Sequence, residues 1–218
     1  RPIRDAAKKI AGTRPSGRLL NLVEEATSEP RSLSYTSDDM TFEMPDSFER
    51  LFEVLDTRPE AKLIAGGTDL ALSITKQRDR LPHLVSLDAI AELRELRFDD
   101  DGAWIGAGLP LADVESGCAE KLPVISRMLR YFGARQIKHR ATMGGNLCNA
   151  SPIGDLAPVL LALDAALVIR SSKGRREVSI DDFFLGYRHT ALQAGEILEA
   201  VRVPTLDAGA VAGAYKVS

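Results

Sequence analysis

Cysteine, histidine and long apolar runs are all scarce in this sequence, and each scarcity excludes a class of site. Its 218 residues include two cysteines and three histidines. Neither Cys118 and Cys148 nor the three histidines (His83, His139 and His189) have the spacing of metal ligands, so we predict no metal site. No apolar run approaches the roughly 18 residues that span a membrane, so we expect no membrane segment. Two isolated cysteines are typical of reduced thiols in a cytoplasmic protein.

A surplus of charge of one sign is also absent. Lys and Arg total 28 against 31 for Asp and Glu, which gives a net charge of −3 at pH 7. Nucleic-acid-binding proteins normally carry a basic patch, so we exclude nucleic acid as a partner. The Gly-Lys-Thr/Ser of a P-loop, the Gly-x-Gly-x-x-Gly of a Rossmann fold and a discernible Ser-His-Asp set are missing as well. We therefore assign no catalytic side chains.

The remaining composition is that of a globular protein, with 44% hydrophobic and 27% charged residues. A chain of this length forms one large domain or two small lobes. Residues 1–40 mix Pro, Ser, Thr and charges with little periodicity, and we predict that they form a linker. Residues 41–90 and 91–218 are predicted to be the two lobes of an α+β fold. The chain begins at Arg1 rather than Met, and we expect it to be part of a longer polypeptide.

Apolar periodicity and turn residues predict the elements of each lobe. A helix over residues 48–56 is expected behind a capping Asp46 or Ser47. Further helices are expected at residues 69–77, 111–118, 123–132 and 156–163. Strands are expected at residues 62–65, 83–87, 93–98, 103–107, 166–170, 175–180, 197–204 and 214–217. The segments 141–146 and 183–188 are expected to be loops.

Paired glycines occur at two places that favour ligand binding. Gly66 and Gly67 lie between a predicted strand and a predicted helix, and Gly144 and Gly145 precede a polar stretch. Glycine lets a ligand approach the main chain because no Cβ intervenes, and free N–H groups at such a turn can hold phosphate. An ordinary tight strand–helix connection would also explain the first turn. Two such turns in one chain indicate a large phosphate-bearing ligand held from two sides.

Side chains near these turns add candidate contacts. Thr142 can offer its hydroxyl to a phosphate oxygen. Asp155 precedes an apolar helix and is either its N-cap or an acceptor for ribose hydroxyls. Phe132 stands at a helix end, where an aromatic residue belongs to the core or contacts a ligand ring. Tyr187 and Arg188 are polar enough to reach a ligand from their loop.

Three motifs follow one another along the chain. They are Leu63-Ile64-Ala65-Gly66-Gly67-Thr68-Asp69-Leu70, then Ala141-Thr142-Met143-Gly144-Gly145-Asn146-Leu147 with Ser151-Pro152-Ile153-Gly154-Asp155, and Phe183-Phe184-Leu185-Gly186-Tyr187-Arg188-His189-Thr190. Together they resemble the FAD-binding domain of the molybdenum hydroxylase family over about residues 42–218. The xanthine dehydrogenase type, whose small subunit joins iron–sulfur and FAD domains, is the most similar. The resemblance implies the two-lobed FAD-binding fold shared with vanillyl-alcohol oxidase and p-cresol methylhydroxylase.

The resemblance also implies roles for individual residues. It places FAD against Leu63, Ile64, Ala65, Gly66, Gly67, Thr68, Asp69, Leu70, Phe132, Thr142, Gly145, Asn146, Asp155 and Lys216. The first motif would hold the diphosphate through its main chain, and Thr142 would contact it too. Asp155 would bind a ribose or ribityl hydroxyl, while Phe132 and Lys216 would lie near the flavin.

The implied activity is electron transfer within a larger enzyme. Electrons would pass from [2Fe-2S] clusters to FAD and then to NAD, with Tyr187 and Arg188 on the NAD side. The expected partners are a [2Fe-2S] domain of the same chain, whose exit Arg1-Pro2-Ile3 resembles, and a large subunit that binds the molybdenum cofactor. The FAD subunit of a carbon monoxide dehydrogenase or aldehyde oxidase-like complex is an alternative, as is a nucleotide-binding module without a redox role. Many relatives continue beyond Lys216 into segments that the sequence does not include, so NAD and oxygen both remain open as acceptors.

Overall fold

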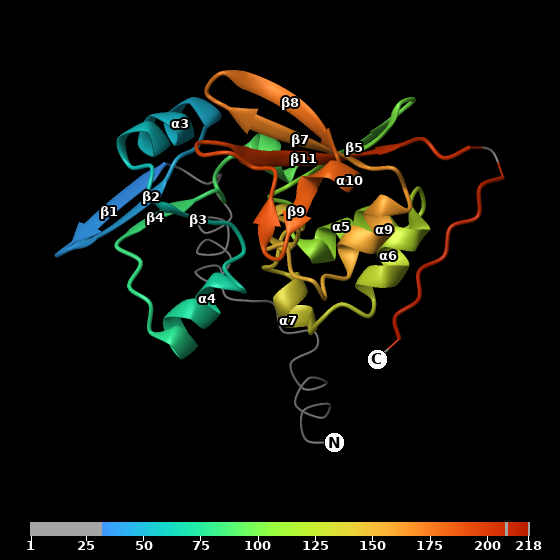
Figure 1. Cartoon of the computed structure of the whole chain (residues 1–218), viewed down its shortest axis with the longest axis horizontal. Coiled ribbons are helices and arrows are strands. Elements are labelled where there is room, and N and C mark those ends of the chain that lie inside the picture. The colour runs from blue at the N-terminus through green and yellow to red at the C-terminus, as the bar shows by residue number, and fades with distance from the viewer. Residues whose placement is uncertain (1–31, 208, 218) are drawn as a thin grey trace, which may run out of the picture. The chain divides into compact units, whose positions relative to one another are not determined.

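The computed structural model describes residues 32–207 and 209–217, and in this part of the chain the fold is a mixture of helices and sheets (Figure 1). One sheet has four strands in the order β1-β2-β4-β3. A second sheet has five antiparallel strands in the order β5-β6-β11-β7-β8. Each sheet has its own cluster of buried apolar side chains.

The four-stranded sheet contains a strand–helix–strand unit, as the sequence predicts. Its elements are β1 (Leu33–Ser37), β2 (Met40–Met44), α3 (Phe48–Thr57), β3 (Lys62–Ile64), α4 (Leu70–Leu72), the π-helical turn η1 (Ser73–Gln77) and β4 (His83–Ser86). β3 and β4 pair in parallel, with α4 and η1 between them in sequence. Ser47 caps α3, because its hydroxyl accepts a hydrogen bond from the Arg50 amide at 3.3 Å. The apolar face of α3 packs against Val85 of β4, which fixes the helix on this sheet.

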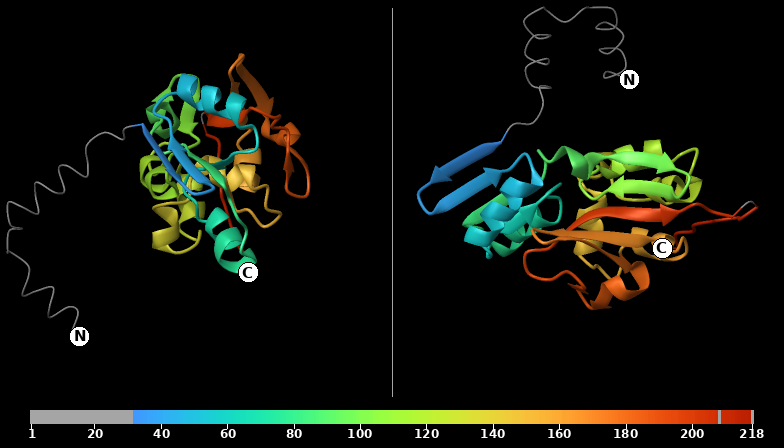
Figure 2. Two further views of the ribbon diagram at one scale, coloured as in Figure 1. Left: turned by 90° about the vertical axis from the view of Figure 1, so that its left-hand side faces the viewer. Right: turned by 90° about the horizontal axis from the view of Figure 1, so that it is seen from above.

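The five-stranded sheet is flanked by several short helices. The elements that follow β4 are η2 (Ala91–Arg94), β5 (Leu96–Asp99), β6 (Gly102–Gly106), α5 (Leu111–Gly117), α6 (Pro123–Leu129), α7 (Arg135–Lys138), α8 (Met143–Cys148), α9 (Leu156–Leu161), β7 (Ala166–Ser171), β8 (Gly174–Ser179), α10 (Ile180–Phe183), β9 (Phe184–Gly186), β10 (His189–Thr190) and β11 (Ile197–Pro204). Figure 2 shows the strands side by side with the helices beneath them. Both predicted hairpins and the predicted strand at 197–204 are confirmed.

Side chains of the five-stranded sheet alternate between two environments, as successive residues of a strand must. On β6, Ala103 and Ile105 join the core formed with helices α5, α6, α8 and α9. Trp104 points to the opposite face, where the guanidinium of Arg97 stacks 4.2 Å from the centre of its ring. The sheet therefore separates an apolar core from a face rich in arginine.

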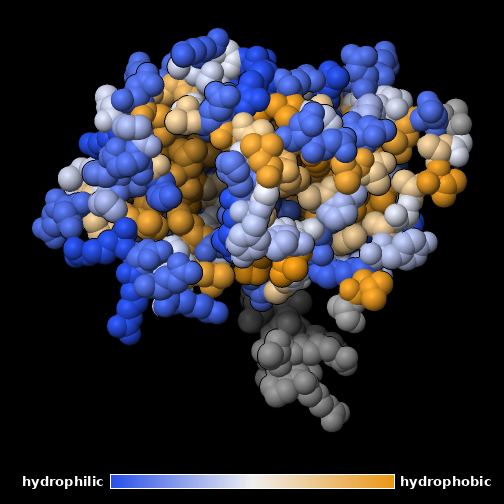
Figure 3. Space-filling view, viewed as in Figure 1, coloured by the Kyte–Doolittle hydropathy of each residue, from blue (hydrophilic) through white to orange (hydrophobic). Residues whose placement is uncertain are grey.

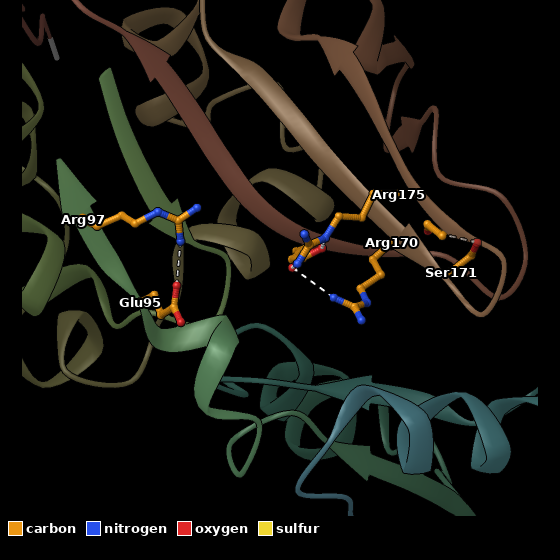
Figure 4. A network of polar contacts seen from close by, with 7 residues as sticks. Glu95, Arg97, Arg170, Ser171 and Arg175 are labelled. Atoms are coloured by element: carbon orange, nitrogen blue, oxygen red, sulfur yellow. Dashed lines mark hydrogen bonds and ion pairs between the residues drawn. The ribbon is translucent and has the colours of Figure 1, made fainter. Parts of the chain in front are cut away.

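A buried carboxylate lies on the arginine-rich face. Glu199 is 1% exposed, and both of its oxygens accept hydrogen bonds from Arg175, at 2.6 and 2.7 Å. Arg170 approaches the same carboxylate at 3.4 Å (Figure 4). The Arg170 guanidinium also stacks on Phe48 of α3, 3.9 Å from the ring centre. The register of β11 against β7 shifts between Leu198 and Ala200, so Glu199 sits in a β-bulge. This cluster connects helix α3 to the larger sheet.

The structure corrects several predictions about local elements. Within the predicted linker at residues 1–40, residues 33–37 form strand β1 and Met40 begins β2. Residues 1–31 of that prediction lie outside the described residues. The segment expected as a loop at 183–188 contains strand β9. No strand forms over residues 214–217. Tertiary pairing decides these cases, because β1 and β9 exist through hydrogen bonds to β2 and β10.

Membrane-spanning helices and clusters of metal ligands are both absent from the part of the chain that the structure describes. No helix within residues 32–207 and 209–217 has the length and apolar character needed to cross a membrane. In the same part of the chain, no group of three or more His, Cys, Asp or Glu side chains is placed to hold a metal ion.

Candidate functional site

A cavity of about 490 Å³ brings the three sequence motifs together. Its walls come from the loop at residues 63–70, from α8 and the turn that follows it, and from the segment at residues 188–198. The space-filling view shows a hollow between these parts of the molecule, with hydrophobic surface around it (Figure 3). Segments far apart in sequence thus line one site.

The loop between β3 and α4 offers free backbone donors. None of the N–H groups of residues 65–69 donates a hydrogen bond to another described residue, although all five residues line the cavity. Gly67 adopts a φ of +73°, a conformation that side chains with a Cβ strongly disfavour. A run of unpaired N–H groups on a tight turn is a favourable environment for phosphate oxygens. The first predicted anion cradle is therefore physically available.

Gly66 has a different role, because it lies where two segments cross. A Cβ built on Gly66 would lie 1.8 Å from the carbonyl oxygen of Arg140 and 2.9 Å from the Cα of Ala141. The Arg140 guanidinium also pairs with Asp88 at 3.0 Å, next to the end of β4. The first and second motifs therefore touch each other through the main chain at Gly66.

The second pair of glycines differs from the expectation of a loop with free amides. Residues 143–148 form helix α8. The amides of Met143 and Gly144 donate to Leu109 and Ala107 at 3.2 and 2.7 Å, and that of Gly145 donates to the Thr142 hydroxyl. The amides of residues 143–145 are thus not free to hold phosphate. Gly144 instead permits close packing, since a Cβ there would lie 2.7 Å from that of Ala107.

Thr142 is buried and begins α8 as its N-cap. Its Oγ1 accepts the Gly145 amide at 3.1 Å, and its hydroxyl proton is donated to no other described residue. Thr142 lines the cavity together with Gly145 and Asn146. The hydroxyl can therefore donate to a ligand oxygen while it caps the helix, as its motif led us to expect.

Asp155 is not a helix cap, which removes one of its two predicted roles. It precedes α9 with α-helical backbone angles, and its side chain makes no capping hydrogen bond. Its carboxylate lines the cavity and accepts a hydrogen bond from Lys216 Nζ at 2.7 Å. Lys216 itself is not among the cavity-lining residues but reaches the site through this ion pair.

Apolar side chains form much of the remaining wall. Phe132 packs against the core of the larger sheet and also lines the cavity, so it is placed where it could contact a ligand ring. Ile137, Leu192, Ile197 and Leu198 line the cavity as well. A site with unpaired amides at one part and apolar side chains at another suits an elongated ligand with phosphates and a flat ring system.

The two residues assigned to the NAD side occupy different positions. Arg188 lines the cavity from a left-handed backbone conformation with a φ of +51°. Tyr187 is 78% exposed and does not line it. The structure thus brings Arg188 to the site and leaves Tyr187 on the surface next to it.

Several lining residues were missed in the sequence. Leu192, Ile197 and Leu198 have the character of ordinary core residues, so periodicity could not separate them from the core. Glu196 was a further omission, and only its contacts distinguish it from a surface acid. Cys148 also lines the cavity, but burial raises the pKa of its thiol to about 12. The thiol therefore stays protonated at neutral pH and is a poor nucleophile.

The sequence matches the model of a family of cofactor-binding domains. The family model described as "FAD binding domain in molybdopterin dehydrogenase" matches residues 38–206. The chain belongs to this family. FAD is accordingly the cofactor of the domain type, and the family is one of oxidoreductases. The unpaired amides and apolar walls described above fit that cofactor.

Curated relatives of this FAD-binding domain include much longer enzymes. The chain is 37% identical over 202 residues to a xanthine dehydrogenase of Emericella nidulans, covering 87% of this chain. It is 34% identical over 198 residues to a xanthine dehydrogenase/oxidase of Rattus norvegicus, covering 85% of this chain. In both cases the match spans 15% of the relative's length.

Solved structures give the same family relationship. Carbon monoxide dehydrogenase from Hydrogenophaga pseudoflava matches with a TM-score of 0.74 and 28% identity, covering 80% of this chain and 62% of that one. Quinoline 2-oxidoreductase from Pseudomonas putida 86 matches with a TM-score of 0.73 and 28% identity, covering 79% and 61%. The FAD-binding domain thus resembles parts of enzymes that act on different substrates.

Replacement of Thr142 tests its double role in this domain. We expect Thr142→Ala to weaken FAD binding about tenfold, because one hydrogen bond to a charged oxygen is lost. Loss of the helix cap should also lower stability by about 1 kcal/mol. Thr142→Ser keeps the hydroxyl and is the matched control, expected to bind within about twofold of the wild type. Isothermal titration of each apoprotein with FAD measures the two affinities. Equal affinities of the Ala and Ser variants would show that the Thr142 hydroxyl does not contact FAD.

Proposed function

We propose that this chain is the FAD-carrying electron-transfer part of a xanthine dehydrogenase-like molybdenum hydroxylase. In the complete enzyme, electrons would pass from [2Fe-2S] clusters to FAD and from there to NAD. The observation that carries the proposal is the loop at residues 65–69, whose amides donate to no other described residue and which lines a cavity with apolar walls. Among the relatives, xanthine dehydrogenases match most of the chain's length.

Different residues of the cavity would bind different parts of FAD. The amides of residues 65–69 would hold the diphosphate, with Leu63, Ile64 and Leu70 beside them. The Thr142 hydroxyl proton would be donated to a phosphate oxygen, while Gly145 leaves space and Asn146 adds a polar side chain. The Asp155 carboxylate would accept a ribose or ribityl hydroxyl.

The remaining side chains would position the ring system. Phe132 and the apolar wall at Leu192, Ile197 and Leu198 would pack on flat rings and exclude water from them. Lys216 would hold its charge near the ring through the ion pair with Asp155. When bound, FAD supplies the exchange of electrons singly and in pairs, and the protein supplies position and electrostatics.

The fold type, the protein partners and the cellular compartment follow from the same assignment. The two sheets with a cavity between their loops are compatible with the two-lobed fold of vanillyl-alcohol oxidase and p-cresol methylhydroxylase, and we propose that fold type. The partners would be a [2Fe-2S] domain of the same chain and a large subunit that binds the molybdenum cofactor. NAD would approach near Arg188, with Tyr187 exposed beside it. Free thiols at Cys118 and Cys148 support a reducing, cytoplasmic compartment.

A second candidate is the FAD subunit of a carbon monoxide dehydrogenase or aldehyde oxidase-like complex. The likeness to the carbon monoxide dehydrogenase structure, with a TM-score of 0.74, favours it. Both candidates need the same FAD site, so the cavity does not separate them. Activity of the complete enzyme on purines, aldehydes and carbon monoxide, with NAD or oxygen as acceptor, would distinguish them.

Titration with FAD tests the function of this chain directly. We expect the full chain to bind one FAD per molecule, with a visible flavin spectrum that remains after gel filtration. ADP should compete, because the diphosphate site at residues 65–69 accepts both ligands. A nucleotide-binding module without a redox role predicts binding of ADP but no retention of FAD. That result, or no binding of either ligand, contradicts the proposal.

A further inference from the structure

Glu196 lines the cavity, and its carboxylate accepts three hydrogen bonds from other residues of the chain. Its two oxygens accept hydrogen bonds from Arg176 Nε and Nη2, both at 2.7 Å. One oxygen also accepts the amide of Gln193 at 2.8 Å. The ion pair lowers the pKa of Glu196, so the carboxylate is charged and neutralised by Arg176 at physiological pH.

Arg176 holds more than the carboxylate. Its Nη2 also donates to the carbonyl oxygen of Ala191 at 2.8 Å. Between Ala191 and Glu196 the chain makes a tight turn, in which Gly195 has a φ of +76° and the Glu196 amide donates to Gln193 at 3.1 Å. The guanidinium therefore fixes both ends of this turn from strand β8.

The fixed turn leads directly into the apolar wall of the cavity. Leu192 lies inside the turn, and Ile197 and Leu198 follow Glu196 at the start of β11; all three line the cavity. Ile197 belongs to the core of the smaller sheet and Leu198 to that of the larger one. A shift of Glu196 would therefore move the wall against which a bound ring must pack.

We propose that Arg176 is a positioning residue of the cofactor site. Through Glu196 and the Ala191 carbonyl it sets the place of Leu192, Ile197 and Leu198, and so determines how closely this wall contacts the flavin ring. The proposal rests on the proposed binding of FAD in this cavity. It assigns a role to an arginine that does not itself line the cavity.

An ordinary surface ion pair in the same sheet provides the comparison. Arg202 of β11 pairs with Glu177 of β8 at 3.6 Å, and about half of each side chain is exposed. Exposed pairs of this kind contribute little to stability. The Arg176–Glu196 pair differs because Glu196 is 11% exposed and the guanidinium also binds the main chain.

The test compares Arg176→Gln with Arg202→Gln in the full chain. We expect Arg176→Gln to raise the Kd for FAD about tenfold, and Arg202→Gln to leave it within about twofold. At saturating FAD, visible circular dichroism of the flavin should change in Arg176→Gln only, because the ring loses its fixed wall. A purely structural role would lower Tm yet leave the saturated spectrum unchanged. The combined exchange Arg176→Glu with Glu196→Arg should restore part of the spectrum.

The outcomes separate this inference from the proposed function. If the wild-type chain binds no FAD, the proposed function fails. If it binds FAD and Arg176→Gln has the same Kd and the same saturated spectrum, the positioning role is overturned while FAD binding stands. Should Arg176→Gln fail to fold, Arg176→Lys decides: an altered spectrum in a folded variant supports the role, and an unaltered spectrum and Kd overturn it.

Discussion

Replacement of Gly66 with alanine is expected to weaken FAD binding by roughly a hundredfold or more. The new Cβ would lie 1.8 Å from the carbonyl oxygen of Arg140 and 2.5 Å from its carbonyl carbon. Both atoms belong to the main chain, so no change of rotamer relieves the clash. The loop at residues 65–69 must move, and its amides then no longer keep their places in the cavity wall. Overpacking strain of about 3 kcal/mol corresponds to a loss of affinity of roughly a hundredfold or more.

A second glycine provides the control for this prediction. A Cβ on Gly186 would meet no heavy atom within 4 Å, and its φ lies outside the left-handed region. We expect Gly186→Ala to bind FAD within about twofold of the wild type, since nothing has to shift. Titration of both apoproteins with FAD, with circular dichroism to verify folding, makes the comparison. A folded Gly66→Ala variant with wild-type affinity would show that the contact between the motifs is irrelevant to the site.

Replacement of Arg175 with glutamine should cause a large loss of stability. Arg175 provides two of the hydrogen bonds to the buried carboxylate of Glu199, and the remaining partner, Arg170, lies at 3.4 Å. Removal of one partner leaves a buried charge poorly compensated, which costs about 3 kcal/mol or more. For a domain of this size the expected fall in Tm is about 6–12 °C. Differential scanning calorimetry of the apoprotein measures it.

An exposed ion pair tests whether burial of Glu199 causes the loss of stability. Arg80 pairs with Asp39 at 3.4 Å, but the two side chains are 87% and 66% exposed. We expect Arg80→Gln to change stability by less than about 1 kcal/mol, because solvent already screens the pair. Equal Tm values for the Arg80 and Arg175 variants would mean that the Glu199 cluster does not hold α3 to the larger sheet.

Local sequence patterns predicted the secondary structure correctly where hydrogen-bond partners lie close together in the sequence. Helix α3 follows from apolar spacing and from Ser47, whose hydroxyl caps it. The hairpins of β5 with β6 and β7 with β8 follow from short turns between apolar strands. These elements pair residues close in sequence, so periodicity and turn chemistry suffice to specify them.

Local sequence patterns failed to predict the secondary structure where the hydrogen-bond partners are distant in the sequence. The glycines at 144–145 favour a flexible turn by composition, yet they begin a helix. Ala107 and Leu109, some 35 residues earlier, accept the amides that would otherwise be free. Strand β1 was missed although its partner β2 follows it directly, because β2 itself pairs in parallel with β4, about 40 residues later, and was not predicted as a strand.

The sequence by itself supplied candidate contacts for the cofactor and, through three ordered motifs, indicated the family to which the chain belongs. Only the tertiary structure decided how these residues act. The amides of residues 65–69 donate to no other described residue, while those of residues 143–145 donate to Leu109, Ala107 and Thr142. It also revealed the apolar wall and the hold of Arg176 on Glu196. The physical reason is that motif chemistry resides in consecutive residues, whereas hydrogen-bond partners and packing neighbours come from the whole chain.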